Sequence, residues 1–278
     1  MSTVVEPVAP ARNGCARFEV VTASPTATSR FRRATTPDVS IILVTWGTGP
    51  VVLDALAALS RSLDARHTEL TADVVVVDNA HPERGHRTAD RISLATAGVR
   101  LVRVPANLGF GGGNDLGVDL GHSELLAFLN PDAIVPVGWL EPLVAEARRH
   151  PDHIVAPRLV RPDGVVDEAG VRVDQRGVTT RVADPPTSNG SAAPTERPKH
   201  DFASAACWVT TRRLYERLGG FDPVFHPAYF EDADLALRAE RVGGGTTIVD
   251  DVDVVHRRGV SVDGPTDASA QGAAFRDR

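Results

Sequence analysis

Polar side chains follow the ends of four apolar segments in the first half of the chain. They are Thr45 with Trp46, Asp78 with Asn79, Asn107, and Asn130 with Asp132. Any one of them could simply favour a turn, as Asp and Asn do in most proteins. Four in succession exceed what turns require, and ligands of open α/β sheets bind beyond the carboxyl ends of the strands. These residues therefore predict a ligand-binding edge that presents carboxylate and amide groups.

A second group of reactive residues lies late in the chain. Glu231, Asp232 and Asp234 begin a predicted helix, where the helix dipole stabilises carboxylates whatever their function. Because Glu231 and Asp232 are adjacent, they point in different directions, so one can cap the helix while the other faces a cleft as a general base. The last apolar segment ends in three residues, His256, Arg257 and Arg258, which taken singly are of types that are usually structural or solvated.

The glycine-rich block NLGFGGGNDLG, residues 107–117, follows a predicted strand and opens a helix. A dinucleotide-binding fingerprint starting at Gly109 would need its third glycine at position 114, which is Asn114, and no acidic residue ends a strand at the expected distance. Glycines still allow close approach of a ligand, and a helix N-terminus favours an anion. A tight strand-to-helix turn explains the block equally well, and both interpretations stay open.

The elements that must position these residues follow from the hydrophobic pattern. Continuous apolar segments predict strands at 39–46, 73–79, 99–104, 124–130, 202–209 and 246–256, and further extended segments at 154–160 and 165–174. Helical periodicity predicts helices at 50–63, 87–98, 113–121, 140–147, 211–218 and 231–243. Strands that alternate with helices indicate an α/β protein whose mostly parallel sheet is covered on both faces.

One domain, residues 38–262, accounts for this pattern. Residues 1–37 lack sustained periodicity and are expected to form a flexible extension with one short strand in ARFEVV, and residues 263–278 a short tail. A loop rich in Pro, Ser, Asn and Thr interrupts the domain at 183–198. The sequence has no apolar run of about 18 residues and no secretory signal, so we expect a cytoplasmic protein, with peripheral contact at the inner face of a membrane left open.

Composition excludes several classes of function. The 278 residues carry 30 Lys and Arg against 36 Asp and Glu, a net charge of -6 that argues against nucleic acid as a partner. Lys199 is the single lysine, so the phosphate-binding motif GxxxxGK is absent. Two cysteines, Cys15 and Cys207, cannot build a disulfide framework or a four-cysteine metal site.

Taken together and in order, the blocks VSIILVTW, VVVVDNA, NLGFGGGNDLG, FLNPDA, FASAACWV, LGGFDPVFHPAYFEDADLALR and VVHRRGVS are distinctive. They resemble the inverting family 2 glycosyltransferases of the GT-A fold, especially their bacterial rhamnosyltransferase-like branch. The resemblance runs from about Val39 to Ser261. It implies a single Rossmann-like domain with a central, mostly parallel mixed sheet flanked by helices.

The resemblance also implies roles for individual residues. Asp232 matches the general base and Glu231 a residue that orients it or binds the acceptor. Asp132 and His256 match ligands of a divalent cation, Mg²⁺ or Mn²⁺. The residues implied in binding the nucleotide-diphosphate sugar are Thr45, Trp46, Asp78, Asn79, Asn107, Gly109, Asn114, Asn130 and Arg257, with Asp78 accepting from the imide N–H of a pyrimidine base.

The implied reaction moves a sugar, such as the deoxysugar rhamnose, from a UDP or dTDP donor to an acceptor hydroxyl. The metal neutralises the leaving diphosphate while Asp232 takes the proton of the hydroxyl, and one displacement inverts the anomeric centre. The acceptor is a soluble natural product, a glycan or a lipid-linked sugar. A homodimer is compatible with the sequence.

Three features depart from the family pattern. Asn130 replaces the first acid of the D-x-D motif, His226 and Pro227 interrupt the aromatic run before Glu231, and only 22 residues follow His256. The short tail favours a soluble acceptor. Asn130 and the tail also motivate a second hypothesis, a catalytically silent domain that binds a nucleotide sugar or a protein. A third, a doubly wound enzyme with a nicotinamide or methionine-derived cofactor, is disfavoured by the broken glycine fingerprint.

Overall fold

The structure is a computed structural model that describes residues 2–4, 18–22, 36–47, 49–64, 67–80, 98–183 and 199–258. The helix expected at 87–98, the loop expected at 183–198 and the expected tail, 263–278, lie outside the described residues except at their edges. No described helix has both the length and the apolar character needed to cross a membrane.

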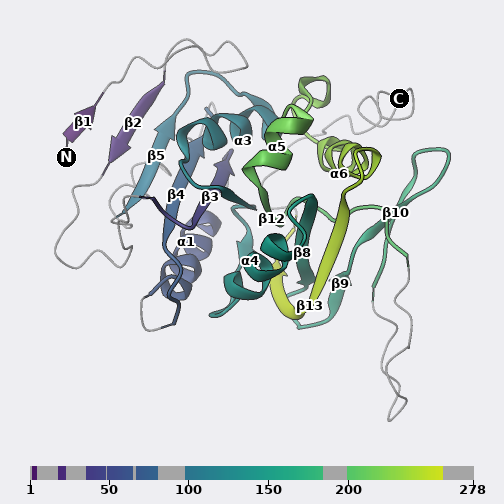
Figure 1. Ribbon diagram of the computed structural model, residues 1–278. Helices are drawn as coiled ribbons and strands as arrows, with labels where there is room; N and C mark the ends of the chain where they lie inside the picture. Colours follow the sequence, from purple (N-terminus) through teal and green to yellow (C-terminus); the bar gives the residue numbers. More distant parts are fainter. Residues whose placement is uncertain are drawn as a thin grey trace.

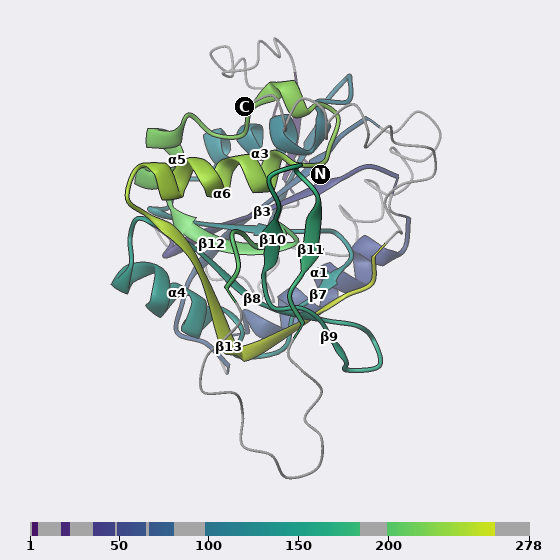
Figure 2. The same ribbon diagram turned by 90° about the vertical axis from the view of Figure 1, so that its right-hand side faces the viewer.

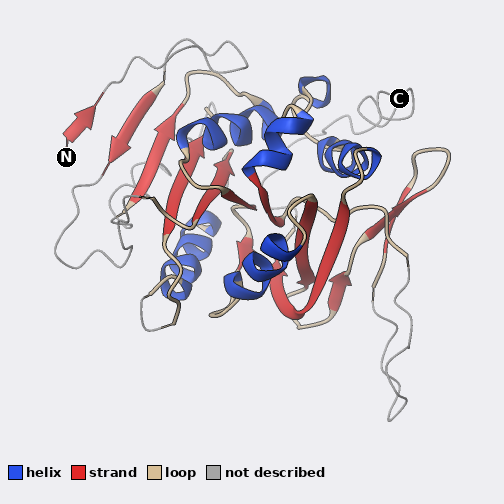
Figure 3. Ribbon diagram, viewed as in Figure 1, coloured by secondary structure: helices blue, strands red, loops and turns tan. Residues whose placement is uncertain are grey.

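One mixed sheet of eleven strands forms the centre of the molecule (Figures 1 and 3). Its strands are β1 (Ser2–Val4), β2 (Glu19–Thr22), β3 (Val39–Thr45), β4 (Ala72–Asp78), β5 (Val99–Arg103), β6 (Leu125–Leu129), β7 (Ala133–Ile134), β8 (His153–Val160), β9 (Val166–Glu168), β12 (Cys207–Thr211) and β13 (Gly245–His256). The strand order is β1-β2-β5-β4-β3-β6-β12-β8-β13-β7, and β9 pairs with β8. A separate hairpin pairs β10 (Val171–Val173) with β11 (Thr179–Arg181).

Six long strands run in one direction and therefore end at one edge of the sheet. β5, β4, β3 and β6 pair in parallel, and β13 pairs in parallel with β8. β12 joins these two groups and is antiparallel to both β6 and β8. The continuous apolar sequence of β3 is fully buried, as expected for a strand covered on both faces. The mostly parallel α/β sheet predicted from the sequence is confirmed.

Helices cover the two faces of this sheet (Figure 2). On one face lie α1 (Val51–Ser62) and α4 (Leu140–Arg149), which pack on the largest hydrophobic cluster. On the other lie α3 (Gly109–Leu120), α5 (Arg212–Leu218) and α6 (Glu231–Arg241), and the short 3₁₀ helix η1 (Pro223–Phe225) precedes α6. The helix predicted at 211–218 is α5, and Gly219 follows its last residue in the left-handed conformation.

The structure departs from the predicted elements in several places, one of which is the helix predicted at 113–121, which begins at Gly109. The strand expected at 202–209 begins only at Cys207, because the amides of Ser204 and Ala205 donate to side-chain carboxylates instead of to a neighbouring strand. Inside the expected N-terminal extension, β2 overlaps the strand predicted in ARFEVV and pairs with β5. β1, which was not expected, pairs with β2. The described part of the extension thus enlarges the sheet.

The glycine-rich block forms a helix packed closely on the sheet. A Cβ atom at Gly117 would overlap Ile42 Cγ2, and one at Gly113 would lie 2.8 Å from Val44 Cγ1. Ile42 and Val44 both belong to β3, so these glycines allow α3 to lie close to this central strand. Close packing of α3 on β3 therefore explains some of the glycines in this block. The sequence analysis considered only a tight turn or contact with a ligand.

Candidate active site

Thr45 and Asp78 lie side by side at the carboxyl ends of β3 and β4. They are paired residues of the parallel ladder, and both are buried. The backbone N–H of Asn79 donates to the Thr45 carbonyl at 2.9 Å, which ties the two strand ends together. Trp46 directly follows Thr45. The edge of the sheet therefore places one hydroxyl and one carboxylate together, as the sequence pattern predicted for adjacent strand ends.

Asn79 and Asn107 form an amide network that shapes the start of α3. Asn79 Nδ2 donates to Asn107 Oδ1 at 2.9 Å and to the Gly109 carbonyl at 3.0 Å, while Asn79 Oδ1 accepts from the Leu108 N–H at 2.8 Å. Asn107 Oδ1 also accepts from the Gly109 N–H. Three of these four bonds fix backbone groups. The side chain of Asn79 thus holds the loop in place.

Asn114 lies one turn inside α3. Its side chain is buried, and Nδ2 donates to the carbonyl of Phe110 at 3.0 Å. That bond to the preceding turn orients the amide, so its Oδ1 is the group with capacity for a further partner.

Asn130, Asp132 and His256 meet where β6 and β13 end. His256 Nε2 lies 3.2 Å from Asp132 Oδ1, and the Arg257 N–H donates to the Asp132 carbonyl at 3.1 Å. Asp132 is 3% exposed. Even so, Asn130 Oδ1 and His256 Nδ1 are buried atoms without a hydrogen-bond partner in the described structure, and Asp132 Oδ1 has only the ion-pair contact with His256. Because burial of an unsatisfied polar atom is costly, this concentration indicates a site built for a ligand.

The backbone of residues 204–206 connects Glu168, Asp232 and Asn130. The Ser204 N–H donates to Glu168 at 2.8 Å, and the Ala205 N–H donates to Asp232 Oδ2 at 3.3 Å. The Ala206 carbonyl accepts from the Asn130 N–H at 2.9 Å. Three consecutive residues therefore join the end of β9, the start of α6 and the end of β6.

Glu168 is a site residue that the sequence did not reveal. It is 3% exposed, and Arg258 Nη2 lies 3.0 Å from its Oε2. Burial raises the pKa of Glu168, while the bond from Ser204 and the charges of Arg258 and His256 oppose that rise. No motif marks it, since VVDEAG is an unremarkable extended segment. A carboxylate at the end of a short apolar strand was the only available signal.

Asp232 and Glu231 begin α6 as the sequence predicted, and their environments raise both pKa values. Burial raises the pKa of Asp232 to about 6, and the nearby Glu168 carboxylate adds to the rise against backbone hydrogen bonds from Ala233 and Ala205. Burial and the charge of Asp232 raise the pKa of Glu231 well above its ordinary value. Asp232 remains partly exposed to solvent. A carboxyl group with a pKa near 6 is suited to act as a base at neutral pH.

The two arginines after His256 are engaged by carboxylates. Arg257 Nη1 lies 2.6 Å from Asp54 Oδ2 on α1, at an exposed position. Arg258 lies between Asp167 and Glu168, at 2.6 and 3.0 Å. Arg257, which the sequence suggested as a donor-binding residue, is therefore held toward α1, and Arg258 is the arginine held toward Glu168.

Comparison with protein families identifies the chain. The model of glycosyl transferase family 2 matches residues 40–219. The chain belongs to glycosyl transferase family 2. Two curated relatives are an uncharacterised protein of Sinorhizobium fredii, 27% identical over 87% of this chain, and the O-antigen biosynthesis protein RfbC of Myxococcus xanthus, 31% identical over 50%. The chain spans 26% of the first relative and 11% of the second.

Solved glycosyltransferase structures share the fold. GalNAc-T7 with UDP, GalNAc and Mn²⁺ superposes with a TM-score of 0.66 at 18% identity, over 83% of this chain and 45% of that one. The mannosyltransferase PcManGT of Pyrobaculum calidifontis with GDP-Man and Mn²⁺ gives 0.53 at 18%, over 86% and 61%. TarS of S. aureus in complex with UDP-GlcNAc gives 0.54 at 15%, over 82% and 61%. The GT-A fold expected from the motifs is thereby confirmed.

Within this family 2 domain, the atoms at the end of β6 fit a hard divalent cation. Mg²⁺ and Mn²⁺ prefer carboxylate, carbonyl and water oxygens, and imidazole is an accepted ligand of transition metals. Asp132, His256 and the amide oxygen of Asn130 supply such ligand atoms, and each residue has a buried polar atom that makes no hydrogen bond in the described structure. The described residues contain no cluster of three or more His, Cys, Asp and Glu, so further ligands would come from the diphosphate and water.

Proposed function

We propose that this domain transfers a sugar from a nucleoside diphosphate donor to an acceptor hydroxyl, with a divalent cation and with inversion of the anomeric centre. The observation that carries the proposal is the arrangement around residues 204–206. There a partly exposed carboxylate of raised pKa, Asp232, is tied by one backbone segment to Asn130, two residues from Asp132. The proposed base and the candidate cation site are thus connected through three residues.

The donor nucleotide is proposed to bind at the ends of β3 and β4. Asp78, buried beside Thr45, would accept the imide N–H of a uracil or thymine ring. Asn107, Gly109 and Asn114 would line the nucleotide and diphosphate from α3, with Asn79 holding that loop in shape. UDP or dTDP carrying a deoxysugar such as rhamnose is the proposed donor. GalNAc-T7 and TarS were solved with UDP or UDP-GlcNAc, which supports a uridine nucleotide, whereas PcManGT was solved with GDP-Man.

In the proposed reaction, the acceptor hydroxyl gives its proton to a carboxylate oxygen of Asp232. The acceptor oxygen attacks the anomeric carbon from the face opposite the diphosphate, and the bond from that carbon to the diphosphate oxygen breaks. Asn130, Asp132 and His256 would hold a divalent cation, which when bound neutralises the charge developing on the leaving diphosphate. Glu168 holds Arg258 and the Ser204 amide, and the adjoining Ala205 amide donates to Asp232.

The test is an incubation of the purified protein with UDP-, dTDP- and GDP-sugars, Mg²⁺ or Mn²⁺, and a panel of hydroxyl acceptors. Release of nucleoside diphosphate that depends on the metal, with a product of inverted anomeric configuration by NMR, is expected. Asp232→Asn should lower kcat by about 10²–10⁴-fold, the usual contribution of a general base, while donor binding is retained. Asp132→Ala should weaken both turnover and donor binding.

The matched control is Glu240→Gln, which changes an exposed carboxylate on the same helix, α6. It should leave turnover unchanged. Near-normal turnover of Asp232→Asn would show that the base is assigned wrongly.

Asn130 in place of an acid favours one alternative, a domain that binds a nucleotide sugar without catalysis. Removal of one anionic ligand weakens the attraction for a cation. Retained nucleotide binding by the wild-type protein, with neither transfer nor hydrolysis under any metal, would support that alternative.

A further inference from the structure

Four non-glycine residues of the described chain have a left-handed backbone conformation. They are Ala80, Tyr229, Phe230 and Arg258, with φ of 54°, 84°, 70° and 40°. Because a Cβ atom makes this region unfavourable, the surroundings must hold each of these residues in it. All four lie within two residues of a candidate site residue, which is Asn79, Glu231 or His256. Backbone strain in the described structure is therefore concentrated at the candidate active site.

Tyr229 and Phe230 are consecutive and lead directly into α6. Phe230 is the N-cap of that helix, with φ of 70° and ψ of -7°, and its carbonyl accepts the Asp234 N–H at 2.9 Å. An N-cap residue usually has an extended backbone and a short polar side chain that bonds to the first turn. Phe230 has neither, and no side chain caps α6. The direction in which this helix starts must therefore be set by other contacts.

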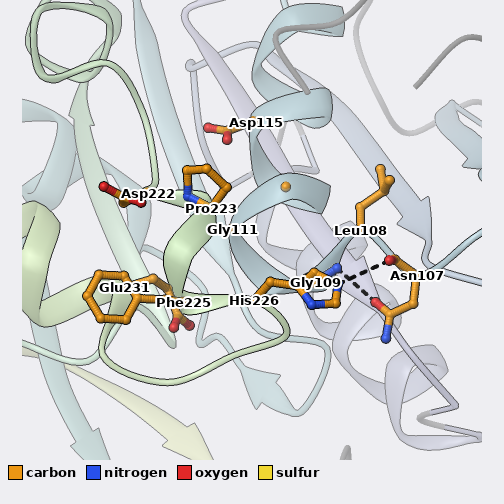
Figure 4. Close-up of a pocket in the computed structure, with 11 residues that line it drawn as sticks. Asn107, Leu108, Gly109, Gly111, Asp115, Asp222, Pro223, Phe225, His226 and Glu231 are labelled. Carbon is orange, nitrogen blue, oxygen red and sulfur yellow. Dashed lines mark hydrogen bonds between the residues drawn. The ribbon is translucent and has the colours of Figure 1, made fainter. Parts of the chain in front are cut away.

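The residues just before this turn are bonded to the start of α3. The Phe110 N–H donates to the Pro227 carbonyl at 2.7 Å, and His226 Nε2 lies 3.3 Å from the Asn107 carbonyl. A Cβ atom at Gly109 would lie 2.8 Å from the Pro227 oxygen, so the two backbones are in close contact. Figure 4 shows His226 beside Gly109 and Asn107, on the wall of a pocket of about 570 Å³. One end of the turn is thus fixed to α3.

The other end of the turn is fixed by the residues that follow it. Burial raises the pKa of the Glu231 carboxyl group, and hydrogen bonds from the backbone of Glu231 and of Tyr229 oppose that rise. The buried side chain of Glu231 therefore bonds back to the turn. Asp232, the next residue, accepts the N–H groups of Ala205 and Ala233. Rotation of the turn would swing the Asp232 carboxylate away from the Ala205 amide.

We propose that Tyr229 and Phe230 are positioning residues, whose left-handed backbone, held between α3 and the Glu231 side chain, directs Asp232 into the site. The proposal rests on the proposed function, because it takes Asp232 as the base. Neither residue supplies a reacting group. Their contribution is a backbone conformation, so substitutions that favour or disfavour positive φ should change turnover even when they remove the same aromatic ring.

The test uses glycine, alanine and valine variants at Tyr229 and, separately, at Phe230. All lack the ring, but glycine adopts positive φ without steric cost, alanine does so less readily and β-branched valine least. We expect kcat to fall in the order glycine, alanine, valine, with the valine variants about tenfold or more below the glycine variants. The KM for the donor should change by about threefold at most, because donor contacts are unaltered. Each glycine variant should have a Tm about 2–4 °C above its alanine counterpart.

Hydrogen exchange of the Ala205 amide, followed by NMR without substrate, measures the same geometry independently of turnover. Because Asp232 accepts this N–H, the amide should exchange about tenfold faster in the valine variants than in the glycine variants. The matched control is Gly243→Ala. Gly243 lies just beyond the other end of α6 with φ of 87°, and a Cβ atom there has no other atom within 4 Å. This substitution should lower Tm and leave both kcat and Ala205 exchange unchanged.

Two results would overturn the proposal. One is equal kcat and equal Ala205 exchange in the glycine and valine variants, and the other is alanine variants as stable as their glycine counterparts. If the wild-type protein transferred no sugar to any acceptor, the proposed function would fail. The exchange of the Ala205 amide would still decide whether the turn directs Asp232, so the two failures are distinguishable.

Discussion

At the scale of single residues, Asp232 combines two properties that a base needs. It is held by the Ala205 and Ala233 amides, which fix its direction, and it is partly exposed, so a substrate can reach it. Helix-dipole stabilisation alone would lower its pKa and weaken it as a base. Burial and the charge of Glu168 raise the pKa of Asp232, and their effect is larger than that of the helix dipole and the backbone hydrogen bonds. The sequence predicted the residue but not this balance, since Glu168 is 64 positions away.

The pH dependence of turnover follows from this balance. With a pKa of about 6, Asp232 is mostly ionised at pH 7 and becomes protonated, hence inactive as a base, as the pH falls through 6. We expect kcat/KM to be level near neutrality and to fall about tenfold per pH unit well below 6. Because burial and the charge of Asp232 raise the pKa of Glu231, the fall in kcat/KM at acidic pH reflects protonation of both carboxylates together. A profile flat down to pH 4.5 would contradict the assignment.

Glu168→Gln should move that acidic limb to lower pH. The substitution removes a negative charge that favours protonation of Asp232, while glutamine can still accept from Ser204. The pH profile of kcat/KM measures the shift. The matched control is Asp167→Asn, which also loses a partner of Arg258 on β9, and it should leave the limb in place. Equal profiles for wild type and Glu168→Gln would show that Glu168 acts only through packing.

At the scale of elements, β12 illustrates where sequence patterns fail. FASAACWV is apolar enough for a strand from Phe202, yet Phe202 makes only an isolated bridge with Val171 and the strand starts at Cys207. Periodicity records which side chains are buried, whereas strand pairing also depends on what the backbone amides bond to. Here the amides of Ser204 and Ala205 bond to carboxylates from β9 and α6. The local departure from regular structure coincides with the candidate site.

α3 offers a test of the packing role of its glycines. Gly117→Ala would force a Cβ against Ile42 in β3, and overpacking of this kind typically costs about 1–3 kcal/mol in the free energy of unfolding. Chemical denaturation measures the loss. In a double-mutant cycle, Ile42→Ala should reduce the cost of Gly117→Ala, because it removes the atoms that the new methyl group meets. Strict additivity of the two substitutions would contradict direct contact.

At the scale of the whole molecule, one sheet edge collects groups from distant parts of the sequence. The alternation of strands and helices predicted that edge, and the motif blocks predicted Asp78, Asp132 and Asp232 on it. The sequence pattern could not predict that Arg257 pairs with Asp54 on α1 while Arg258 pairs with Glu168 on β9, because neither carboxylate belongs to a recognisable motif. With both arginines engaged by carboxylates, compensation of the charge of the proposed diphosphate would depend more heavily on a cation held by Asp132 and His256.

The thermal stability of the folded chain should therefore increase when the donor nucleotide and the metal bind together. A ligand that binds only the folded state raises its stability, and UDP with Mn²⁺ at one hundred times its Kd should raise Tm by about 5–10 °C. Asp132→Asn should lose most of that shift, because it removes an anionic ligand beside His256. Asp253→Asn, which alters a more exposed carboxylate in the same strand as His256, should keep it. If Asp132→Asn retained the full Mn²⁺-dependent shift, the cation would have to bind elsewhere, and the proposed site at the end of β6 would be wrong.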